Sequence, residues 1–385
     1  GTFAISGQKI FISWGDSDFP KNICHLVLAR LPDGAPGTKG ISLFMVPKFL
    51  PDAEGNLGKR NNLRAVSLEH KMGLHGSPTA VMEYNNATGW LIGDPHNGMA
   101  AMFTMMNNAR LGVGIQGIGV AEAAFQKAVT FARERVQGKA DGEGTIIEHT
   151  DVRRMLTSMK AELFAARAIA FSCATSIDLA RATENPDWSV RAAFLTPIAK
   201  AFGTVTGIYV ANEGIQVHGG MGFIEETGAA QFLRDVRVTA SYEGTNGIQA
   251  MDLVGRKLRD GGEAAYRLLD EIETHAEHAR SARPDLAECV WSAAETLREA
   301  TEWLVDRDME DRSAGAVSYT KAFARVLGAH FHLMASLTEN AKGPRTALAE
   351  HYIKRILPEH VALLTIVKEG SAGLFDLSPE DLADR

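Results

Sequence analysis

The hydrophobic pattern of this chain changes its period near residue 98, and this change limits which elements each part can form. Before that point, short apolar runs are bounded by turn residues, which is typical of β-strands. After it, apolar residues recur at helical spacing over long stretches. We therefore expect the chain to begin with a sheet and to continue as packed helices.

Residues 1–95 show no helical signal between the strand candidates, which predicts an antiparallel sheet or a piece of a β-barrel. Ser6 and Gly7 are interpreted as a turn between the first two strands. The expected strands are Phe3–Ile5, Lys9–Ile12, His25–Ala29 and Ile41–Val46, with one or two more between Leu63 and Tyr84. A barrel that starts at Gly1 would leave an open edge, and the chain starts without Met, so we expect preceding sequence.

Residues 96–258 carry long amphipathic stretches of similar length, which predict an antiparallel four-helix bundle. The expected helices are Met99–Gln137, Asp151–Arg181, Ser189–Val217 and Gly247–Arg259. Asp151 suits the start of the second helix, and Gly219 with Gly220 should end the third.

Residues 259–385 predict an additional helical domain without a recognisable chemical motif, so we expect it to be structural or oligomeric. Its expected helices are Leu268–Ala279, Cys289–Val305, Tyr319–Leu337 and Thr346–Ile356. The predicted fold class is therefore α+β, with a β-barrel piece, a four-helix bundle and extra C-terminal helices.

Charge and composition exclude several classes of function. The net charge of −7 argues against a general binder of nucleic acid or anionic membranes. No uninterrupted apolar stretch approaches the ~20 residues that span a bilayer, so no membrane span is predicted. Three scattered cysteines provide no disulfide framework, and the protein is expected to be cytoplasmic.

Common catalytic and cofactor motifs are absent or out of context. Gly112–Gly117 matches the dinucleotide string GxGxxG, but it falls inside a predicted helix without a preceding strand, so close helix packing is the better interpretation. The sequence contains no HExxH pair and no EF-hand loop, so no metal site is predicted. It also contains no GxSxG nucleophile elbow.

Two glycine-rich segments are more informative. Gln216–Gly222 ends a long helix with more glycines than a C-cap needs, which leaves open a plain turn or a backbone approached closely by a phosphate or a cofactor edge. In Tyr242–Gln249, Glu243 lies in a glycine-punctuated loop between helices. It could be a general base aimed into a cleft or a surface acid, with Thr245 capping the next helix.

Together, the motifs of this chain resemble those of the flavin-dependent acyl-CoA dehydrogenases, in the same order and with compatible spacing. The matching segments are Lys9–Ser13, Lys71–Gly73, Gly76–Thr79, Arg110, Arg133–Gly138, Gln216–Gly222 and Tyr242–Thr245. The resemblance covers residues 1 to about 255. It implies a helical domain, a β-barrel and a four-helix bundle, of which the N-terminal helical domain is absent from this chain.

The resemblance implies an enzyme that converts an acyl-CoA thioester to a trans-2-enoyl-CoA. Glu243 occupies the position of the base that takes the α-proton, while the β-hydrogen leaves as hydride to N5 of FAD. The resemblance also implies eight cofactor-binding residues: Phe11, Ser13, Arg135, Gln137, Gln216, Gly219, Gly220 and Thr245. Arg110, Tyr242 and Gly244 are the implied substrate-binding residues, and Gln216, Gly219 and Gly220 would meet FAD across a subunit boundary.

Some features depart from the common family pattern. The usual Arg-x-x-Phe-Gly run appears as Arg135–Gly138, one residue shorter and without Phe, and residue 109 is Ala rather than an alternative base. The helices after residue 260 resemble a larger branch that includes 3-methylthiopropionyl-CoA dehydrogenases and bacterial fatty acyl-CoA dehydrogenases.

The expected partners are an acyl-CoA and electron-transfer flavoprotein, in a homodimer or larger homo-oligomer acting in fatty acid β-oxidation. Two alternatives stay open. The specific activity could be that of a 3-methylthiopropionyl-CoA dehydrogenase, or the chain could be a non-catalytic helical scaffold of the same fold.

Overall fold

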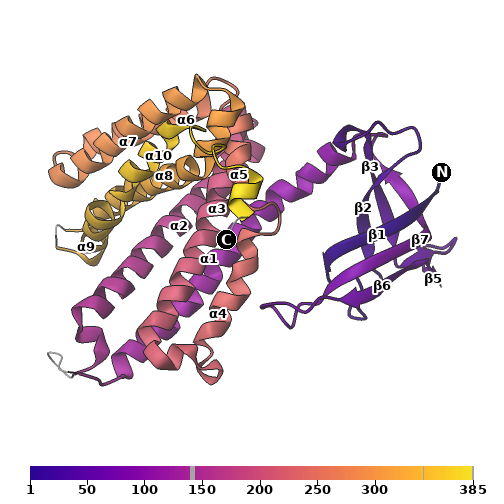
Figure 1. Ribbon diagram of the computed structural model, residues 1–385, viewed down its shortest axis with the longest axis horizontal. Helices are drawn as coiled ribbons and strands as arrows, with labels where there is room; N and C mark the ends of the chain where they lie inside the picture. The colour runs from indigo at the N-terminus through magenta and orange to yellow at the C-terminus, as the bar shows by residue number, and fades with distance from the viewer. Residues whose placement is uncertain (139–143, 341, 384–385) are drawn as a thin grey trace. The chain divides into compact units, whose positions relative to one another are not determined.

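A computed structural model of the protein describes residues 1–138, 144–340 and 342–383. The chain forms two compact units, Gly1–Asn108 and Ala109–Arg385 (Figure 1). The first contains the sheet and the start of helix α1, and the second contains the remaining helices. The boundary predicted at residue 258 falls inside the second unit, and the three-domain division itself stays a prediction.

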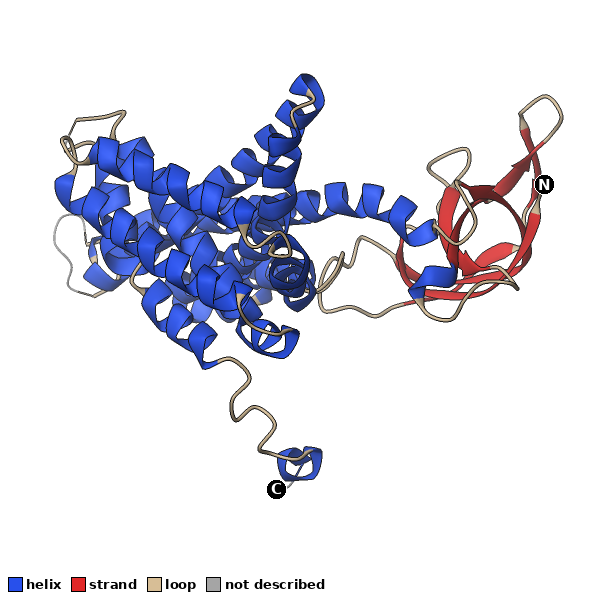
Figure 2. Ribbon diagram, turned by 90° about the horizontal axis from the view of Figure 1, so that it is seen from above, coloured by secondary structure: helices blue, strands red, loops and turns tan. Residues whose placement is uncertain are grey.

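The sheet of the first unit is antiparallel and curls on itself, as the strands in Figure 2 show. Its long strand β7 pairs with β1, β3 and β6, and β2 pairs with β3. Two short strands, β4 and β5, pair separately. The strands are β1 Phe3–Ser13, β2 Cys24–Arg30, β3 Ile41–Pro47, β4 Phe49–Pro51, β5 Leu57–Arg60, β6 Leu63–Leu68 and β7 Thr79–Ile92.

The turn predicted at Ser6 and Gly7 is wrong, because β1 runs through both residues as one strand. The register of β1 against β7 shifts between Ile5 and Gly7, which marks a β-bulge. Gly7 has a φ of 137°, which favours glycine. The bulge lets one continuous strand bend where the sequence pattern indicates two.

The second unit is helical, and its elements share one hydrophobic core that includes residues of both the predicted bundle and the later helices. The helices are α1 Gly98–Glu134, α2 Thr150–Thr183, α3 Pro186–His218, α4 Ala229–Val236, α5 Asn246–Asp252, α6 Glu263–Ala279, α7 Pro284–Val305, α8 Met309–Ser336, α9 Pro344–His351, α10 Glu359–Glu369 and α11 Pro379–Ala383. Helix α8 packs against α2, α5, α7 and α10. The additional helices therefore support the bundle directly.

Helix α3 packs against α2, α4, α5 and α8 and has well-defined ends. Asn185 accepts a hydrogen bond from the Asp187 N–H at 2.9 Å, and Pro186 occupies the first helical position. At the other end Gly219 has a φ of 58°, and its N–H donates to the Gln216 carbonyl. The predicted stop at Gly219 is confirmed.

The glycine string of α1 serves helix packing. A Cβ atom on Gly117 would lie 2.6 Å from the carbonyl oxygen of Gly203 in α3, and a Cβ on Gly203 would lie 2.6 Å from the Gly114 carbonyl oxygen. Any side chain at these positions would force the two helices apart. Because the string also lies inside a helix, the rejection of a dinucleotide-binding turn is confirmed.

Two described helices are long and apolar enough to cross a membrane by those criteria alone. The most apolar windows of α2 and of the segment Pro186–Phe223 have mean hydropathies of 1.4 and 1.2. In the second, 78% of the window is buried within the structure, and the core helix of a globular unit meets the same criteria. The predicted absence of a membrane span therefore stays a prediction.

Candidate functional site

Glu243 lies in a short loop with unusual backbone geometry. It has a φ of 55° and Gly244 a φ of 86°, so two successive residues are left-handed. For a residue with a side chain this conformation costs of order 1–3 kcal/mol and persists only where its surroundings hold it. Thr245 then caps α5, its hydroxyl accepting a hydrogen bond from the Ile248 N–H at 3.3 Å. Thr245 thus caps the helix, and it follows closely on a half-buried glutamate whose backbone is strained.

Two buried side chains hold the backbone of this loop. Lys200 of α3 is fully buried, and its Nζ donates to the Gly244 carbonyl and to Oδ1 of Asn246, both at 2.9 Å. The amide of Gln249, also fully buried, donates to the Glu243 carbonyl at 3.3 Å. Gly244 needs its positive φ, and a Cβ there would come within 2.8 Å of the Gln249 amide nitrogen and displace it from the Glu243 carbonyl.

One further polar contact ties the loop to α1, and an ion pair joins α1 to α5. The Tyr242 hydroxyl donates to the side-chain oxygen of Gln116 in α1. Arg110 is buried and pairs with the buried carboxylate of Asp252 at 3.1 Å, and the other carboxylate oxygen accepts from Arg256 at 2.6 Å. The prediction of Arg110 as a substrate-binding residue is not tested, but its guanidinium is already engaged beneath the loop.

Charges around the loop are coupled. Burial, followed by the nearby charge of Arg110, lowers the pKa of Lys200 to about 8, and the opposing charge of Glu243 only partly offsets this. Burial raises the pKa of the Tyr242 hydroxyl, the Gln116 hydrogen bond opposes that shift, and the Glu243 charge adds to it. The carboxylate thus lies among groups that respond to its charge.

All the predicted cofactor residues of the helical unit except Thr245 gather at the far ends of α1 and α3. Phe131 and His218 stack with ring centroids 4.4 Å apart, which places the C-terminal ends of these helices side by side. Arg135 donates to the Gln137 side chain at 2.8 Å, and both residues are exposed. Gly219 follows Lys200 by 19 residues, which corresponds to about 28 Å along a helix at 1.5 Å per residue. Within one copy of the chain, these residues therefore lie far from the Glu243 loop.

The three glycine positions after α3 differ in whether the local structure requires glycine. Gly219 needs its positive φ, whereas a Cβ on Gly222 would lie 2.2 Å from the Ile215 carbonyl oxygen. Gly220 is exposed, and a Cβ there would meet no described atom within 4 Å. Neither backbone angle nor intrachain packing requires glycine at position 220. Gln216 and Gly219 are also exposed, so this helix end presents open backbone.

In the β unit, Phe11 and Ser13 lie at the exposed end of β1. Phe11 has a φ of 59° and is 68% exposed, at a second irregularity in the pairing of β1 with β7. Trp14 and Phe19, both exposed, lie close by with ring centroids 5.9 Å apart. The unit thus carries an exposed aromatic group next to the hydroxyl of Ser13.

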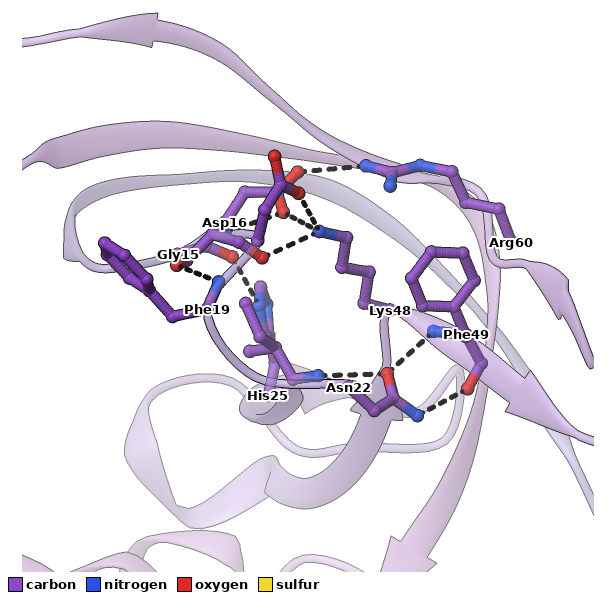
Figure 3. A network of polar contacts seen from close by, with 11 residues as sticks. Gly15, Asp16, Phe19, Asn22, His25, Lys48, Phe49 and Arg60 are labelled. Atoms are coloured by element: carbon purple, nitrogen blue, oxygen red, sulfur yellow. Dashed lines mark hydrogen bonds and ion pairs between the residues drawn. The ribbon is translucent and has the colours of Figure 1, made fainter. Parts of the chain in front are cut away.

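A polar network fixes the loop that follows β1, as Figure 3 shows. The buried Lys48 pairs with Asp16 at 2.6 Å, and Arg60 donates to the same carboxylate at 2.9 Å. Burial raises the pKa of Asp16, but the hydrogen bonds from Lys48 and Arg60 outweigh it and hold the pKa below its usual value. His25 holds the Gly15 carbonyl at 2.8 Å. The exposed aromatic residues therefore sit on an ordered loop.

One group of potential metal ligands occurs among the described residues, formed by Glu271, His275 and His330. Arg191 donates to both oxygens of Glu271, at 2.5 and 3.1 Å. The carboxylate already has a cationic partner, and a metal ion would lie next to that guanidinium. We assign no metal to this group.

The structure thus brings Glu243, Tyr242, Gly244 and Thr245 together above Arg110. It collects Arg135, Gln137, Gln216, Gly219 and Gly220 elsewhere in the same unit. Sequence reasoning missed the supporting residues: Lys200, Gln116, Gln249 and Asp252. Only Lys200 gave a signal, since it is a lone charge in the apolar run from Pro197 to Phe202.

Two segments match known protein families. Residues 96–258 match the family described as acyl-CoA dehydrogenase, C-terminal domain, and residues 268–378 match acetyl-CoA dehydrogenase C-terminal like. A solved structure of an acyl-CoA dehydrogenase complexed with FAD, from Bacillus anthracis, superposes with a TM-score of 0.76 at 18% identity. It covers 95% of this chain and 64% of the other, and supports the fold.

Curated relatives extend the comparison. The chain is 51% identical over 281 residues to a 3-methylmercaptopropionyl-CoA dehydrogenase of Ruegeria pomeroyi, covering 71% of this chain and 48% of that protein. It is 32% identical over 427 residues to a butyryl-CoA dehydrogenase of Syntrophomonas wolfei, covering 99% of this chain and 68% of that protein. It thus spans about half the length of the first relative and about two thirds of the second. With this similarity across nearly its whole length, the chain belongs to the acyl-CoA dehydrogenase family.

Proposed function

We propose that the protein is an FAD-dependent acyl-CoA dehydrogenase in which Glu243 removes the α-proton of the thioester substrate. The observation that carries the proposal is the left-handed, half-buried Glu243 held by Lys200 and Gln249 in a chain of this family. The exposed Glu184 has a similar φ of 54°, but it ends helix α2, whereas the loop that contains Glu243 is held by buried side chains. The scaffold alternative leaves this strain unexplained.

The chain's own residues account for proton removal. A carboxylate is a weak base for a carbon acid, so the site must bind the thioester oxygen where negative charge develops. The resemblance assigns one of these donors to the backbone N–H of Glu243. The hydrogen bonds on the Glu243 and Gly244 carbonyls fix the two peptide planes that follow this N–H, and so limit how far the Glu243 backbone can rotate.

The residues at the ends of α1 and α3 fit a dinucleotide cofactor. Gly220 leaves exposed backbone without a local reason for glycine, and the exposed Arg135 offers a cation for a pyrophosphate. Together with Gln137, Gln216 and Gly219 they would hold the adenosine and pyrophosphate of FAD. Phe11, Ser13 and Thr245 would contact FAD elsewhere. When bound, FAD supplies the acceptor for the β-hydride.

We propose 3-methylmercaptopropionyl-CoA as the substrate to test first, because the relative of that name is 51% identical over 71% of this chain. Short linear acyl-CoA thioesters are the second class, because two relatives are named butyryl-CoA dehydrogenases. Tyr242 and Gly244 flank the base and would contact the thioester. From the family resemblance we further propose electron-transfer flavoprotein as oxidant, a homo-oligomer, a cytoplasmic location and a role in β-oxidation.

The deciding experiment is anaerobic titration of the FAD-loaded protein with 3-methylmercaptopropionyl-CoA and with linear acyl-CoA thioesters of increasing length. We expect the visible flavin absorbance to bleach in proportion to thioester, with the tightest titration naming the substrate class. A protein that binds FAD but is bleached by none of these thioesters would contradict the proposed activity. A protein that does not take up FAD would contradict the cofactor assignment.

A further inference from the structure

Lys200 is an unusual lysine because its charge is buried without an acidic partner. Its side chain is fully buried in α3, and among residues 1–138, 144–340 and 342–383 no carboxylate lies within ion-pair distance of Nζ. Its acceptors are a carbonyl oxygen and an amide oxygen. A buried cation with only neutral acceptors is costly, and a neutral side chain of similar size would pack at lower cost. The cost indicates that the ammonium group is used.

Both acceptors of Lys200 belong to the segment that follows Glu243. The Gly244 carbonyl and Oδ1 of Asn246 each accept at 2.9 Å, and Thr204 of α3 holds the same amide through a 3.1 Å hydrogen bond from Asn246 Nδ2. One ammonium group therefore joins α3 to the two residues on either side of Thr245. The Glu243 carbonyl is held by Gln249 and the next carbonyl by Lys200, so a rotation of Glu243 to the usual negative φ would disturb hydrogen bonds along this segment.

We propose that Lys200 is the positioning residue that fixes the Glu243 loop in its strained conformation. The inference rests on the proposed function, because it gives the strain a purpose. The geometry carries it, since Nζ of Lys200 donates to the Gly244 carbonyl and to Oδ1 of Asn246, both at 2.9 Å.

The surroundings of Lys200 predict a pH dependence. The charged groups that act on it are Arg110 from α1 and Glu243 from the loop. Arg110 in turn pairs with Asp252 of α5, and Lys321 of α8 lines the same small cavity as Asn246. Burial and Arg110 bring the pKa of Lys200 to about 8. Above that pH the amine loses its charge and one of its three N–H donors, so its hold on the loop weakens. Proton removal should therefore weaken on the alkaline side.

The test compares Lys200→Met with Lys200→Arg, and uses Lys160→Met as the control, since Lys160 is an exposed lysine of α2. The first readout is hydrogen exchange of the Ile248 and Gln249 amides in the cofactor-free protein. Both donate to Thr245, which lies between the two residues that Lys200 holds. We expect about 10-fold faster exchange there in Lys200→Met, with unchanged exchange in the core of α3. The control should match the parent protein. This readout depends on neither FAD nor substrate.

The second readout is flavin reduction in the FAD-loaded protein as a function of pH. We expect Lys200→Met to reduce flavin about 100-fold more slowly, because a small displacement of a reacting group costs that much, and to lack the alkaline limb near pH 8. Lys200→Arg, which retains charge and donors, should recover part of the rate. If Lys200→Met does not fold, Lys200→Gln replaces it in both readouts.

The outcomes separate the two proposals. Parent-like exchange at Ile248 and Gln249 together with a parent-like pH profile in the neutral variant would overturn the role of Lys200, whatever the substrate is. A parent protein whose flavin no thioester bleaches would overturn the dehydrogenase activity, while faster exchange at these amides would still support the hold of Lys200 on the Glu243 loop.

Discussion

At the scale of single residues, Glu243 is the group whose replacement tests the chemistry most directly. Glu243→Gln keeps the size of the side chain and the loop hydrogen bonds, which involve backbone carbonyls. The amide cannot accept the α-proton, so we expect flavin reduction by the preferred thioester to fall by about 10⁴-fold, while FAD content stays that of the parent. Stopped-flow measurement of flavin absorbance checks the rate.

The matched control for this variant is Glu226→Gln, an exposed acid in the turn before α4. It removes the same charge at a distance from the loop and should leave the rate unchanged. Parent-like reduction by Glu243→Gln would show that another group takes the proton.

The residue scale also shows what sequence reasoning can and cannot find. Glu243 was singled out because glycine-punctuated loops can aim a carboxylate, and the motif match then gave it a role. Its left-handed backbone could not be predicted, since φ depends on contacts with Lys200 and Gln249 from elsewhere in the fold. Lys200 was missed because a charged residue in a helix is usually exposed, and only packing shows it to be buried.

At the scale of elements, the end of α3 separates structural from functional glycines. Gly222→Ala would place a methyl group 2.2 Å from the Ile215 carbonyl oxygen, so we expect it to lower the free energy of unfolding by roughly 1–3 kcal/mol. Gly220→Ala meets no described atom and should leave stability unchanged. It should instead weaken FAD binding. Urea unfolding and FAD titration of both variants test the pair, and a Gly220→Ala protein with parent-like FAD affinity would contradict the cofactor role.

Helix α8 carries a second prediction at this scale, through two buried histidines. Burial lowers the pKa of His330 and of His332 to about 4, with nearby cationic groups adding to the shift and the Ala161 carbonyl partly opposing it at His332. The unfolded chain binds these protons near pH 6.5 and the folded chain does not. The free energy of unfolding should therefore fall as pH drops from 6.5 to 4, by roughly 3 kcal/mol per histidine, and level off below.

Urea unfolding of His332→Gln across this pH range checks the sign and size of the effect. In this variant the slope of the free energy of unfolding against pH should be smaller by about 1.4 kcal/mol per pH unit. The exposed His278→Gln of α6 should keep the parent slope. An unchanged slope in His332→Gln would show that this histidine is protonated in the folded protein.

The three longest helices were predictable, whereas the long strand β1 was predicted as two strands and several short elements were missed. Helices α1, α2 and α3 carry many apolar residues at helical spacing and end near recognisable caps, so their expected limits lie within a few residues of those found. Helices α4, α10 and α11 and strands β4 and β5 were missed. They are too short to show a period, and packing against neighbours rather than local pattern decides their structure.

At the scale of the whole molecule, the separation of the two candidate sites has a consequence for assembly. Along α3, Lys200 and Gly219 are about 28 Å apart. Gln116 lies on α1, and Arg135 comes 19 residues later, directly after the end of that helix. Both helices therefore keep the Glu243 loop away from the exposed glycine end. The family resemblance assigns both to FAD, which predicts that the glycine end of one copy completes the site of its neighbour.

Mixed oligomers test that prediction with two inactive variants. Glu243→Gln lacks the base, and Gly220→Asp places a carboxylate where the pyrophosphate would bind, on exposed backbone with room for a side chain. If each site combines Glu243 of one copy with Gly220 of the other, a mixed dimer contains one intact site and one doubly defective site. Unfolding and refolding the two variants together in equal amounts should then restore about one quarter of the parent activity, because half of the dimers are mixed and each has one working site. If both groups serve the same copy, no mixed dimer contains an intact site, and the mixture should stay as inactive as its components.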